Sequence, residues 1–421
     1  MYKSFPETRQ LYTSSKEKPS VMHAKIRMKD LIDPEALRLA VDSTMQRYPY
    51  FCVELQKVDG QYVFEENQRP VVVANSAHGV ELNADASNYH MVAFSWWDNW
   101  IVLDMFHGLT DGTGVYEVVR TLLYYYCSER YGIKVREDGI RLAGDPIPQE
   151  EWVDPVEQAT NLPVPPRTQL SKAINPRMAA GLDDDVQRTV YSVAIPESEF
   201  MRFNIQNDGS PATMVSLFLC RAVANLYPDN TDAIRVVLCV NQRKALGAPL
   251  AHQSLVGGAM LEYKQKMRSW PVDRQATVFR GMVFAQTREE IVLAGVASQR
   301  ALSQLILSKE TEQERIGVVS YIDNMASDIL TATVSYVGKA DYKESENYIR
   351  DFRTWTSQTS DNILVEISAV GGRFVLDFMQ SFSSPVYVNA FCRELDENGI
   401  TYDLQDVQRL ELPNIRLPWS Q

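Results

Sequence analysis

A histidine and an aspartate four residues apart, in the segment FHGLTDG, are the side chains of this chain best suited to chemistry. The neutral imidazole of His107 can take a proton from a hydroxyl or an amine, and the unperturbed histidine pKa of ~6.5 suits that role at cellular pH. Asp111 has two candidate roles, because its carboxylate either orients the imidazole or points away and fixes the turn through a cation. The pair predicts single-base chemistry on a substrate that already carries its activated group.

A buried strand and a buried helix are expected to hold these two residues. An apolar run ends at Phe106, and beyond Gly112 apolar residues recur at helical spacing from 115 to 131. His107 and Asp111 therefore lie on a tight turn between rigid elements, and such a turn fixes the side chains that it carries.

Other reactive arrangements find little support in the sequence. His252 lies in loop-like sequence and His90 begins an expected strand, and a lone histidine is more often structural or exposed. A metal site would need a third ligand beside His107 and Asp111, but no HxH, HExxH or acidic cluster supplies one. No GxSxG segment is present, and no cysteine adjoins a histidine. We therefore expect neither a metal ion nor a permanently bound cofactor.

The composition is that of an acidic globular protein. With 421 residues the chain is long enough for two domains of about 200 residues each. Its hydrophobic content of 45% and its charged content of 23% are ordinary for such proteins. A net charge of −12 at pH 7 argues against a nucleic-acid-binding surface, which normally carries a basic stripe.

Cysteine usage and the N-terminal segment bear on the compartment. The five cysteines are an odd number, widely spaced and without a CxxC motif, so we expect reduced, buried thiols in a reducing compartment. The first residues, MYKSFPETRQLYTSS, lack the apolar core of a signal peptide, and no stretch approaches ~20 uninterrupted apolar residues. We expect a cytoplasmic protein without membrane insertion.

Strand and helix signals occur in both halves of the chain and predict an α/β (α+β) protein. Residues 145–185 interrupt them with seven prolines and little periodicity, which is typical of a linker or a crossover on the surface. We therefore expect an N-terminal lobe at 1–144, this Pro-rich segment at 145–185, and a C-terminal lobe at 186–421. The first lobe is expected to contain a mixed or antiparallel sheet with a hairpin at residues 98–99.

The segment FHGLTDG resembles the HxxxDG signature of the acyltransferase superfamily that includes chloramphenicol acetyltransferase. Relatives in that superfamily include condensation domains of nonribosomal peptide synthetases, alcohol acetyltransferases, polyketide-associated acyltransferases and plant BAHD enzymes. HxxxDG alone is moderately specific, but further family-like stretches follow in the expected order over nearly the whole chain. These stretches are Asp33-Pro34-Glu35 with Arg47-Tyr48-Pro49, the strand end with Arg243, Val256-Gly257-Gly258, Ser335-Tyr336-Val337-Gly338, and a closing helix over 391–400.

The resemblance implies two lobes, each a mixed sheet flanked by helices, with an active-site tunnel between them. His107 matches the general base of the superfamily. Asp111 matches an aspartate that points out of the site and pairs with an arginine, and Arg243 stands at that arginine's position. Such a pair would rigidify the turn without drawing charge from the base. Gly108 and Gly112 match the active-site loop, where Gly112 allows the backbone to approach the reacting carbonyl closely.

The resemblance also places Ser335, Tyr336 and Gly338 along the tunnel, with the Ser335 hydroxyl as a candidate for binding the oxyanion. Tyr336 stands where family members frequently have asparagine, and Phe106 stands where condensation domains often carry a second histidine. The DFGWG motif of the plant enzymes is absent, and no carrier-protein serine motif is visible. Phe106 and the missing carrier-protein motif favour a stand-alone enzyme over a domain of a peptide synthetase.

The implied activity is transfer of an acyl group from a thioester to a hydroxyl or an amine of a small-molecule acceptor. Acyl-coenzyme A is the expected donor, so coenzyme A would be part of a co-substrate and not a bound cofactor. An acyl-carrier thioester is the alternative donor, and a chain that used it would be a stand-alone condensation-type enzyme with a carrier protein as partner. A further alternative is an inactive relative that keeps the fold and binds a partner.

Overall fold

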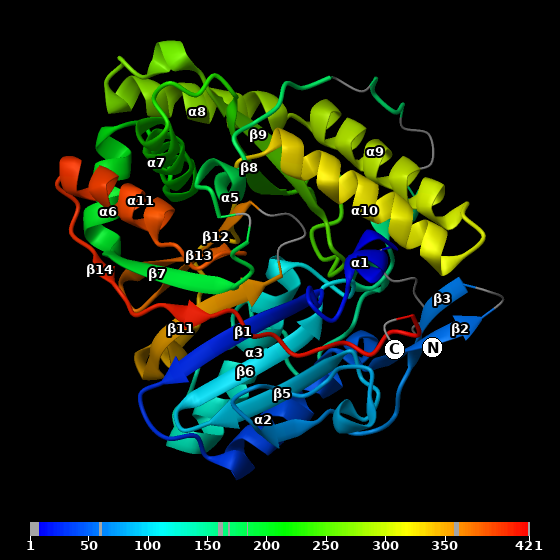
Figure 1. Cartoon of the computed structure of the whole chain (residues 1–421). Coiled ribbons are helices and arrows are strands. Elements are labelled where there is room, and N and C mark those ends of the chain that lie inside the picture. Colours follow the sequence, from blue (N-terminus) through cyan, green and yellow to red (C-terminus); the bar gives the residue numbers. More distant parts are fainter. Residues whose placement is uncertain are drawn as a thin grey trace.

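The strands of the first lobe form a mixed sheet with the order β11-β1-β6-β5-β4 (Figure 1). β5 and β6 make the predicted hairpin around residues 98–99, and β6 continues the antiparallel pairing to β1. The bounds are β1 Val21–Met28, β4 Val73–Asn75, β5 Val92–Trp97, β6 Trp100–Phe106 and β11 Ile349–Thr356. The computed structural model describes residues 8–58, 61–158, 163–166, 169–182, 184–357 and 362–419.

Helices α2 (Pro34–Arg47) and α3 (Gly112–Tyr131) lie against one face of this sheet (Figure 1). α2 begins directly after Asp33, whose carboxylate caps it by accepting the backbone N–H groups of Glu35 at 3.0 Å and Ala36 at 3.1 Å. Buried side chains recur at helical spacing along α3 and join those of the sheet in one apolar core. α3 is therefore held firmly behind the turn that carries His107.

The second lobe contains a larger sheet with the order β14-β7-β13-β12-β10-β8-β9, and β15 lies beside β7. β10 runs parallel to both β8 and β12, whereas the other neighbouring strands are antiparallel. A second apolar core lies between this sheet and the helices that cover it. The bounds are β7 Thr189–Pro196, β8 Ile234–Asn241, β9 Val256–Tyr263, β10 Ala332–Tyr336, β12 Ile363–Val370, β13 Arg373–Gln380, β14 Asp403–Leu404, β15 Gln408–Arg409, α6 Glu197–Gln206, α7 Pro211–Leu226, α8 Val272–Gln286 and α11 Val386–Glu397.

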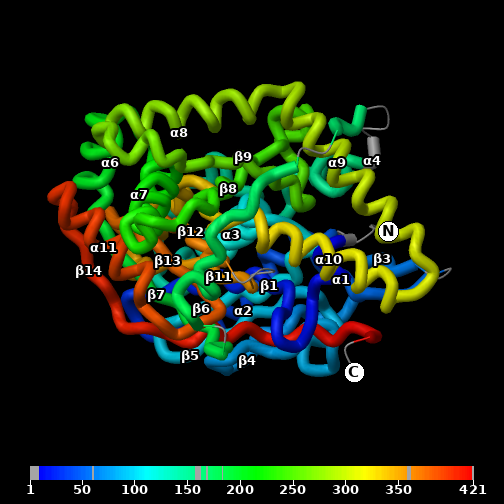
Figure 2. Tube along the Cα trace, turned by 45° about the horizontal axis from the view of Figure 1, so that its top comes forward, coloured from blue at the N-terminus to red at the C-terminus, as the bar shows by residue number. Residues whose placement is uncertain are grey.

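A pair of long helices, α9 (Glu289–Leu307) and α10 (Glu312–Ile329), extends from the second lobe to the N-terminal helix α1 (Figure 2). The guanidinium of Arg9 and the carboxylate of Asp323 join α1 to α10 at 2.6 Å. The remaining short elements are α1 Thr8–Thr13, β2 Val53–Val58, β3 Gln61–Glu66, α4 Pro155–Gln158 and α5 Pro176–Ala179.

Strand β11 and the C-terminal residues both return to the first lobe. β11 lies within the expected 186–421 lobe, yet it pairs antiparallel with β1 along its length. Near the C-terminus, Ile415 forms a bridge with Leu82, and both figures show this stretch crossing the first lobe. Two segments of the expected 186–421 lobe thus pair with the first lobe. Their position follows from the free edges of the first lobe and not from their order in the chain. Residues 159–162, 167–168 and 183 of the Pro-rich segment lie outside the described residues.

The Pro-rich segment is tied to the first lobe through a buried carboxylate. Both oxygens of Glu151 accept from the guanidinium of Arg47, at 3.0 and 2.7 Å, and the Tyr50 hydroxyl donates to the same carboxylate at 2.9 Å. Bidentate pairs of this kind fix orientation as well as distance. The described chain is thus a mixed α/β protein of two helix-flanked sheets, as predicted.

Candidate active site

His107 follows β6 directly, on the turn that leads into α3. Its backbone N–H donates to the carbonyl of Ser20 in the first lobe at 2.8 Å. The neighbouring Thr110 hydroxyl donates to the carbonyl of His252, which lies between β8 and β9 of the second lobe. The turn is therefore held by backbone groups of both lobes.

The His107 ring is oriented by a backbone carbonyl and not by Asp111. Its Nδ1 atom lies 3.1 Å from the carbonyl oxygen of Thr110. A carbonyl only accepts, so in the neutral ring Nδ1 carries the hydrogen and Nε2 keeps its lone pair. Nε2 has no hydrogen-bond partner among the described residues and is not buried. This nitrogen is free to take a proton from a bound molecule.

The Asp111 carboxylate begins α3 and faces away from the imidazole. It accepts the backbone N–H groups of Thr113 at 2.9 Å and Gly114 at 3.3 Å, which caps the helix. It also accepts the N–H of Leu255 from the second lobe at 3.0 Å. Arg243 donates to both of its oxygens, at 2.8 and 3.0 Å. This geometry agrees with the second candidate role of Asp111, in which its carboxylate fixes the turn by pairing with a cation, here Arg243.

Every N–H of the Arg243 guanidinium has an acceptor within the described residues. Besides the two bonds to Asp111, Nε donates to the Ala251 carbonyl at 2.7 Å and Nη2 donates to the Gln253 carbonyl at 2.9 Å. The remaining Nη1 hydrogen points to Asn241 Oδ1 at 3.4 Å. Arg243 is 4% exposed and Asp111 is 1% exposed. A fully bonded buried pair of this kind acts as a rigid clamp between the lobes.

Glycines permit the close packing around this turn. A Cβ on Gly112 would lie 2.5 Å from Cγ2 of Val337, the residue that follows β10 of the second lobe. A Cβ on Gly108 would lie 2.3 Å from Cε1 of Phe106. Both distances are too short for carbon atoms, so any side chain at these positions would displace its neighbour. The loop thus needs glycine for packing at Gly108 and Gly112.

His252, which the sequence placed in a loop, lies buried beneath the turn. Its ring stacks on that of Tyr50, with ring centroids 4.2 Å apart, and it meets Phe51 edge-on. Burial lowers the pKa of His252 to about 3, so the ring is neutral at physiological pH. A small cavity of about 50 Å³ lies between this ring, Arg243 and the start of α3. His252 is a packing partner of the turn and not a second base.

The residues predicted along the tunnel separate onto different faces of β10. Ser335 and Val337 share the face that meets the His107 turn, since Val337 contacts Gly112. Tyr336 points the opposite way, because side chains alternate along a strand, and its ring packs edge-on against Phe374. Tyr336 was expected along the tunnel, and its ring lies instead against the second apolar core. Gly338 has a φ of +109°, a conformation that glycine adopts readily, where the chain leaves β10.

An acidic residue that was not among the expected site residues, Glu366, lies beside Ser335. β10 and β12 pair in parallel with these two residues in register. The hydroxyl of Ser335 stabilises the ionised carboxylate, but burial has the larger effect and raises the pKa of Glu366 to about 8. The signal was present in the sequence, since ILVEISAV contains one acid within an apolar strand.

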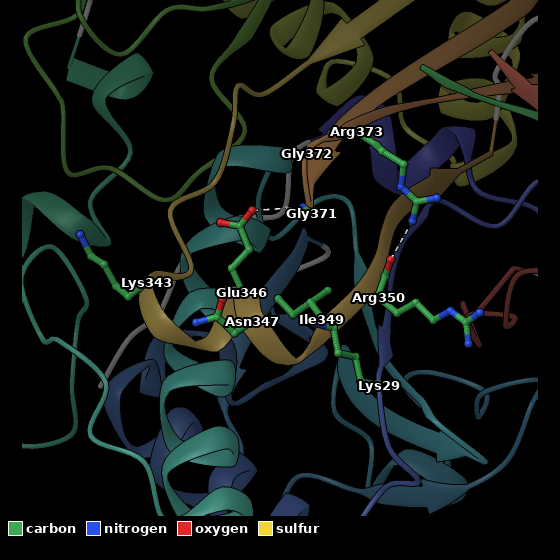
Figure 3. A pocket seen from close by; sticks show the side chains of 9 residues that line it. All are labelled: Lys29, Lys343, Glu346, Asn347, Ile349, Arg350, Gly371, Gly372 and Arg373. Atoms are coloured by element: carbon green, nitrogen blue, oxygen red, sulfur yellow. Dashed lines mark hydrogen bonds between the residues drawn. The ribbon is translucent and has the colours of Figure 1, made fainter. Parts of the chain in front are cut away.

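A larger hollow of about 530 Å³ opens at the turn between β12 and β13 (Figure 3). Its lining includes Lys29, Arg350 and Arg373, and the Arg373 guanidinium donates to the Arg350 carbonyl at 3.1 Å. Glu346 accepts the backbone N–H of Gly371 at 3.1 Å across the same opening. Its lining contains none of the predicted site residues, so it is separate from the His107 turn.

The described residues contain no cluster of three or more His, Cys, Asp or Glu side chains arranged to hold a metal ion. The cysteines are unpaired, and burial raises the pKa of the Cys239 thiol to about 12. Within the same residues, no helix combines the length and the apolarity needed to cross a membrane.

Comparison with known proteins yields a likeness in structure. No protein-family model matches the chain, and no curated protein sequence does. Among solved structures, polyketide synthase associated protein 5 from Mycobacterium tuberculosis is similar over 92% of this chain and 95% of its own, with 13% identity and a TM-score of 0.57. F. sporotrichioides TRI101, solved with coenzyme A and T-2, is similar over 96% of this chain and 100% of its own, with 10% identity and a TM-score of 0.57.

A condensation domain belongs to the same set of similar structures. That of the Monacolin K polyketide synthase MokA is similar over 93% of this chain and 95% of its own, with 10% identity and a TM-score of 0.57. These likenesses span nearly the full length of the chain at low identity. The chain therefore has the two-lobed fold that condensation domains share with TRI101 and with polyketide synthase associated protein 5.

Proposed function

We propose that this protein is an acyltransferase that moves an acyl group from a thioester to a hydroxyl or an amine, with His107 as its general base. The observation that carries the proposal is the His107 ring itself. Its Nδ1 donates to the Thr110 carbonyl, and its Nε2 is unpartnered and accessible within the described residues. The TRI101 structure with coenzyme A supports a thioester of coenzyme A as the donor.

In the proposed reaction, Nε2 of His107 takes the proton of the acceptor hydroxyl or amine as that nucleophile attacks the thioester carbonyl. A tetrahedral intermediate forms, with negative charge on the former carbonyl oxygen. The carbon–sulfur bond then breaks, and the departing thiolate receives the proton from the imidazolium. One base thus serves both half-steps, and general-base catalysis of this kind typically contributes ~10²–10⁴-fold.

The Asp111–Arg243 clamp fixes the position of the base in this scheme. Among the described residues, the Asp111 carboxylate makes no hydrogen bond to the imidazole. Its charge is paired with the guanidinium of Arg243. The clamp also joins the turn to the second lobe, so that residues of both lobes can hold the two reactants beside His107. Effective positioning of this kind accounts for a large share of enzymatic rate enhancement.

The proposal is tested by incubating the purified protein with radiolabelled acetyl-coenzyme A and longer acyl-coenzyme A donors against a panel of alcohols and amines. Acylated carrier protein serves as the parallel donor. We expect transfer from acyl-coenzyme A to at least one acceptor class. Transfer from the carrier protein alone would show a condensation-type enzyme, and no transfer from any thioester would leave only a binding protein with this fold.

A further inference from the structure

Polar side chains form a row across the second sheet, on the face turned to the first lobe. Strand register places them side by side, since Ser335 pairs with Glu366, Glu366 pairs with Asp377, and Asp377 pairs with Ser192. Cys239 adjoins Ser335 from β8, and its thiol is hydrogen-bonded to the Ser335 hydroxyl. The row therefore crosses β8, β10, β12, β13 and β7 in a single line.

One half of the row is closed by the first lobe. The two oxygens of Asp377 accept from the Ser192 hydroxyl at 2.5 Å and from the indole Nε1 of Trp355 at 2.8 Å. The guanidinium of Arg353 lies 3.7 Å from the same carboxylate and donates to Ser192 at 2.7 Å. Trp355 and Arg353 belong to β11 of the first sheet. This half is a satisfied structural network, with its cation supplied by the protein.

The other half of the row is open. Glu366 is half-buried on a central strand, with the Ser335 hydroxyl beside it and no Lys or Arg paired with it among the described residues. Cys239 and Ser335 also keep accessible surface, whereas Leu238 and Val334, which point to the opposite face, are buried. Accessible surface at the centre of a sheet requires a space in front of it.

This open half lies next to the His107 turn. On the same face, Asn241 follows Cys239 by two residues and reaches the Thr113 hydroxyl at 3.5 Å. Val337 follows Ser335 by two residues and touches Gly112. Two residues of strand span about 7 Å, so the open half lies one pleat away from the start of α3. Tyr116, one turn into α3, is close enough to Glu366 for the carboxylate to influence its pKa.

We propose that Glu366, with Ser335, binds a protonated amine on the acceptor and so selects acceptors that carry a basic nitrogen near the hydroxyl or amine to be acylated. The proposal rests on the acyltransferase function proposed above. A carboxylate enclosed without a cation is destabilised, and a bound ammonium would supply the missing partner. Asp377, its neighbour in the row, already has this partner in Arg353.

The ionisation of Glu366 also favours a cationic ligand in the open half of the row. At neutral pH in the free protein, most Glu366 carboxyls are protonated, because burial raises their pKa to about 8. A cationic ligand would restore the ionised form and release a proton. Cys239 and Tyr116, which face the same space, cannot replace Glu366 as the anionic group. Burial raises the pKa of Cys239 to about 12 and also raises the pKa of Tyr116, so both stay neutral at this pH. Asp377 is engaged by Trp355 and Ser192.

The test compares dimethylamino alkanols with isoalkyl alcohols of the same length, in which CH replaces NH⁺. A tertiary amine keeps its charge and gives no stable amide, so both acceptors react at oxygen. Each is assayed for kcat/KM with acyl-coenzyme A, and each is titrated calorimetrically into the protein without donor. The variants are Glu366→Gln, Glu366→Asp and, as the control from the closed half of the row, Asp377→Asn.

In the wild type we expect the amino alkanol to be preferred by about tenfold or more, with an affinity that rises between about pH 6 and pH 8 as the carboxylate becomes available. Glu366→Gln should abolish the preference and the pH dependence while turnover of the isoalkyl alcohol persists. Glu366→Asp should retain part of the preference. Asp377→Asn should lower thermal stability and leave the preference intact.

The two proposals fail in different ways. Equal kcat/KM for both alcohols in the wild type and in Glu366→Gln would overturn the amine site and leave acyl transfer standing. Selective binding of amino alkanols that is lost in Glu366→Gln, without turnover of any acceptor, would support the site and contradict the proposed reaction. Neither selective binding nor selective turnover in the wild type would also overturn the amine site.

Discussion

The carboxylates of Asp111 and Glu366 lie on opposite sides of the interface between the lobes, and their surroundings differ sharply. Asp111 accepts from three backbone N–H groups and from both terminal nitrogens of Arg243. Glu366 has a hydroxyl beside it and no cation among the described residues. A buried acid with all its partners fixes geometry, whereas one that lacks a cation is available to a ligand. The same interface thus contains a clamp and an open position.

The largest effect is expected from breaking the clamp. Arg243→Ala would leave the Asp111 carboxylate buried without its cation, and removal of one partner of a buried pair typically costs about 3–5 kcal/mol of unfolding free energy. Chemical denaturation measures this change. Arg350→Ala, at an exposed arginine, is the control and should leave stability unchanged. A loss below about 1 kcal/mol in Arg243→Ala would contradict a structural role for the pair.

The contact between the His107 turn and the second lobe gives an intermediate effect. A Cβ at Gly112 would overlap Val337 Cγ2, so Gly112→Ala should cost about 1–3 kcal/mol and displace the turn. Val337→Ala removes the overlapping methyl groups and should restore stability in the double variant. Thermal melting of the two single variants and the double variant measures the coupling. Purely additive changes would show that Gly112 and Val337 are not in contact.

The smallest effect concerns Glu366 and depends on pH. Its pKa is raised from the ordinary 4.5 to about 8, so the folded chain holds this proton more tightly than the unfolded chain. Unfolding free energy therefore decreases as pH rises through this window, and Glu366→Gln removes the decrease. We expect the Tm of the variant to be a few degrees above that of the wild type at about pH 8.5 and equal to it at about pH 4. A pH-independent difference would show that Glu366 ionises normally.

Local signals in the sequence predict much of the first lobe. Asp33 followed by proline marks the start of α2 because a helix cap involves only neighbouring residues. The hairpin at residues 98–99 is likewise local. The sequence predicts helices over 273–293 and 298–308, but α8 ends at Gln286 and α9 begins at Glu289. The break lies in a polar run over 286–290, where two acidic residues, Glu289 and Glu290, form the first turn of α9.

Features that depend on distant partners could not be predicted from the pattern of residues. β11 reads IRDFRTWT, with no regular apolar alternation, and its buried Arg353 is paired with Asp351 and lies near Asp377. The Asp111–Arg243 contact was expected through the family resemblance, since nothing in the local sequence joins residues so far apart. Glu366 is recognisable as an acid in an apolar strand, but only the assembled sheet shows that Asp377 has a nearby arginine, whereas Glu366 has none among the residues that the structure describes.

The role of His107 as the base is best tested by measuring acyl transfer and folding stability together in His107→Ala. If the imidazole is the base and the clamp holds the turn, this variant should lose at least about 10²-fold in kcat/KM, because the proton acceptor is gone. Its unfolding free energy should stay within about 1 kcal/mol of the wild type, since the ring is half-buried and makes a single hydrogen bond within the described residues. A loss of less than tenfold in kcat/KM with folding intact would contradict the assignment of His107 as the base.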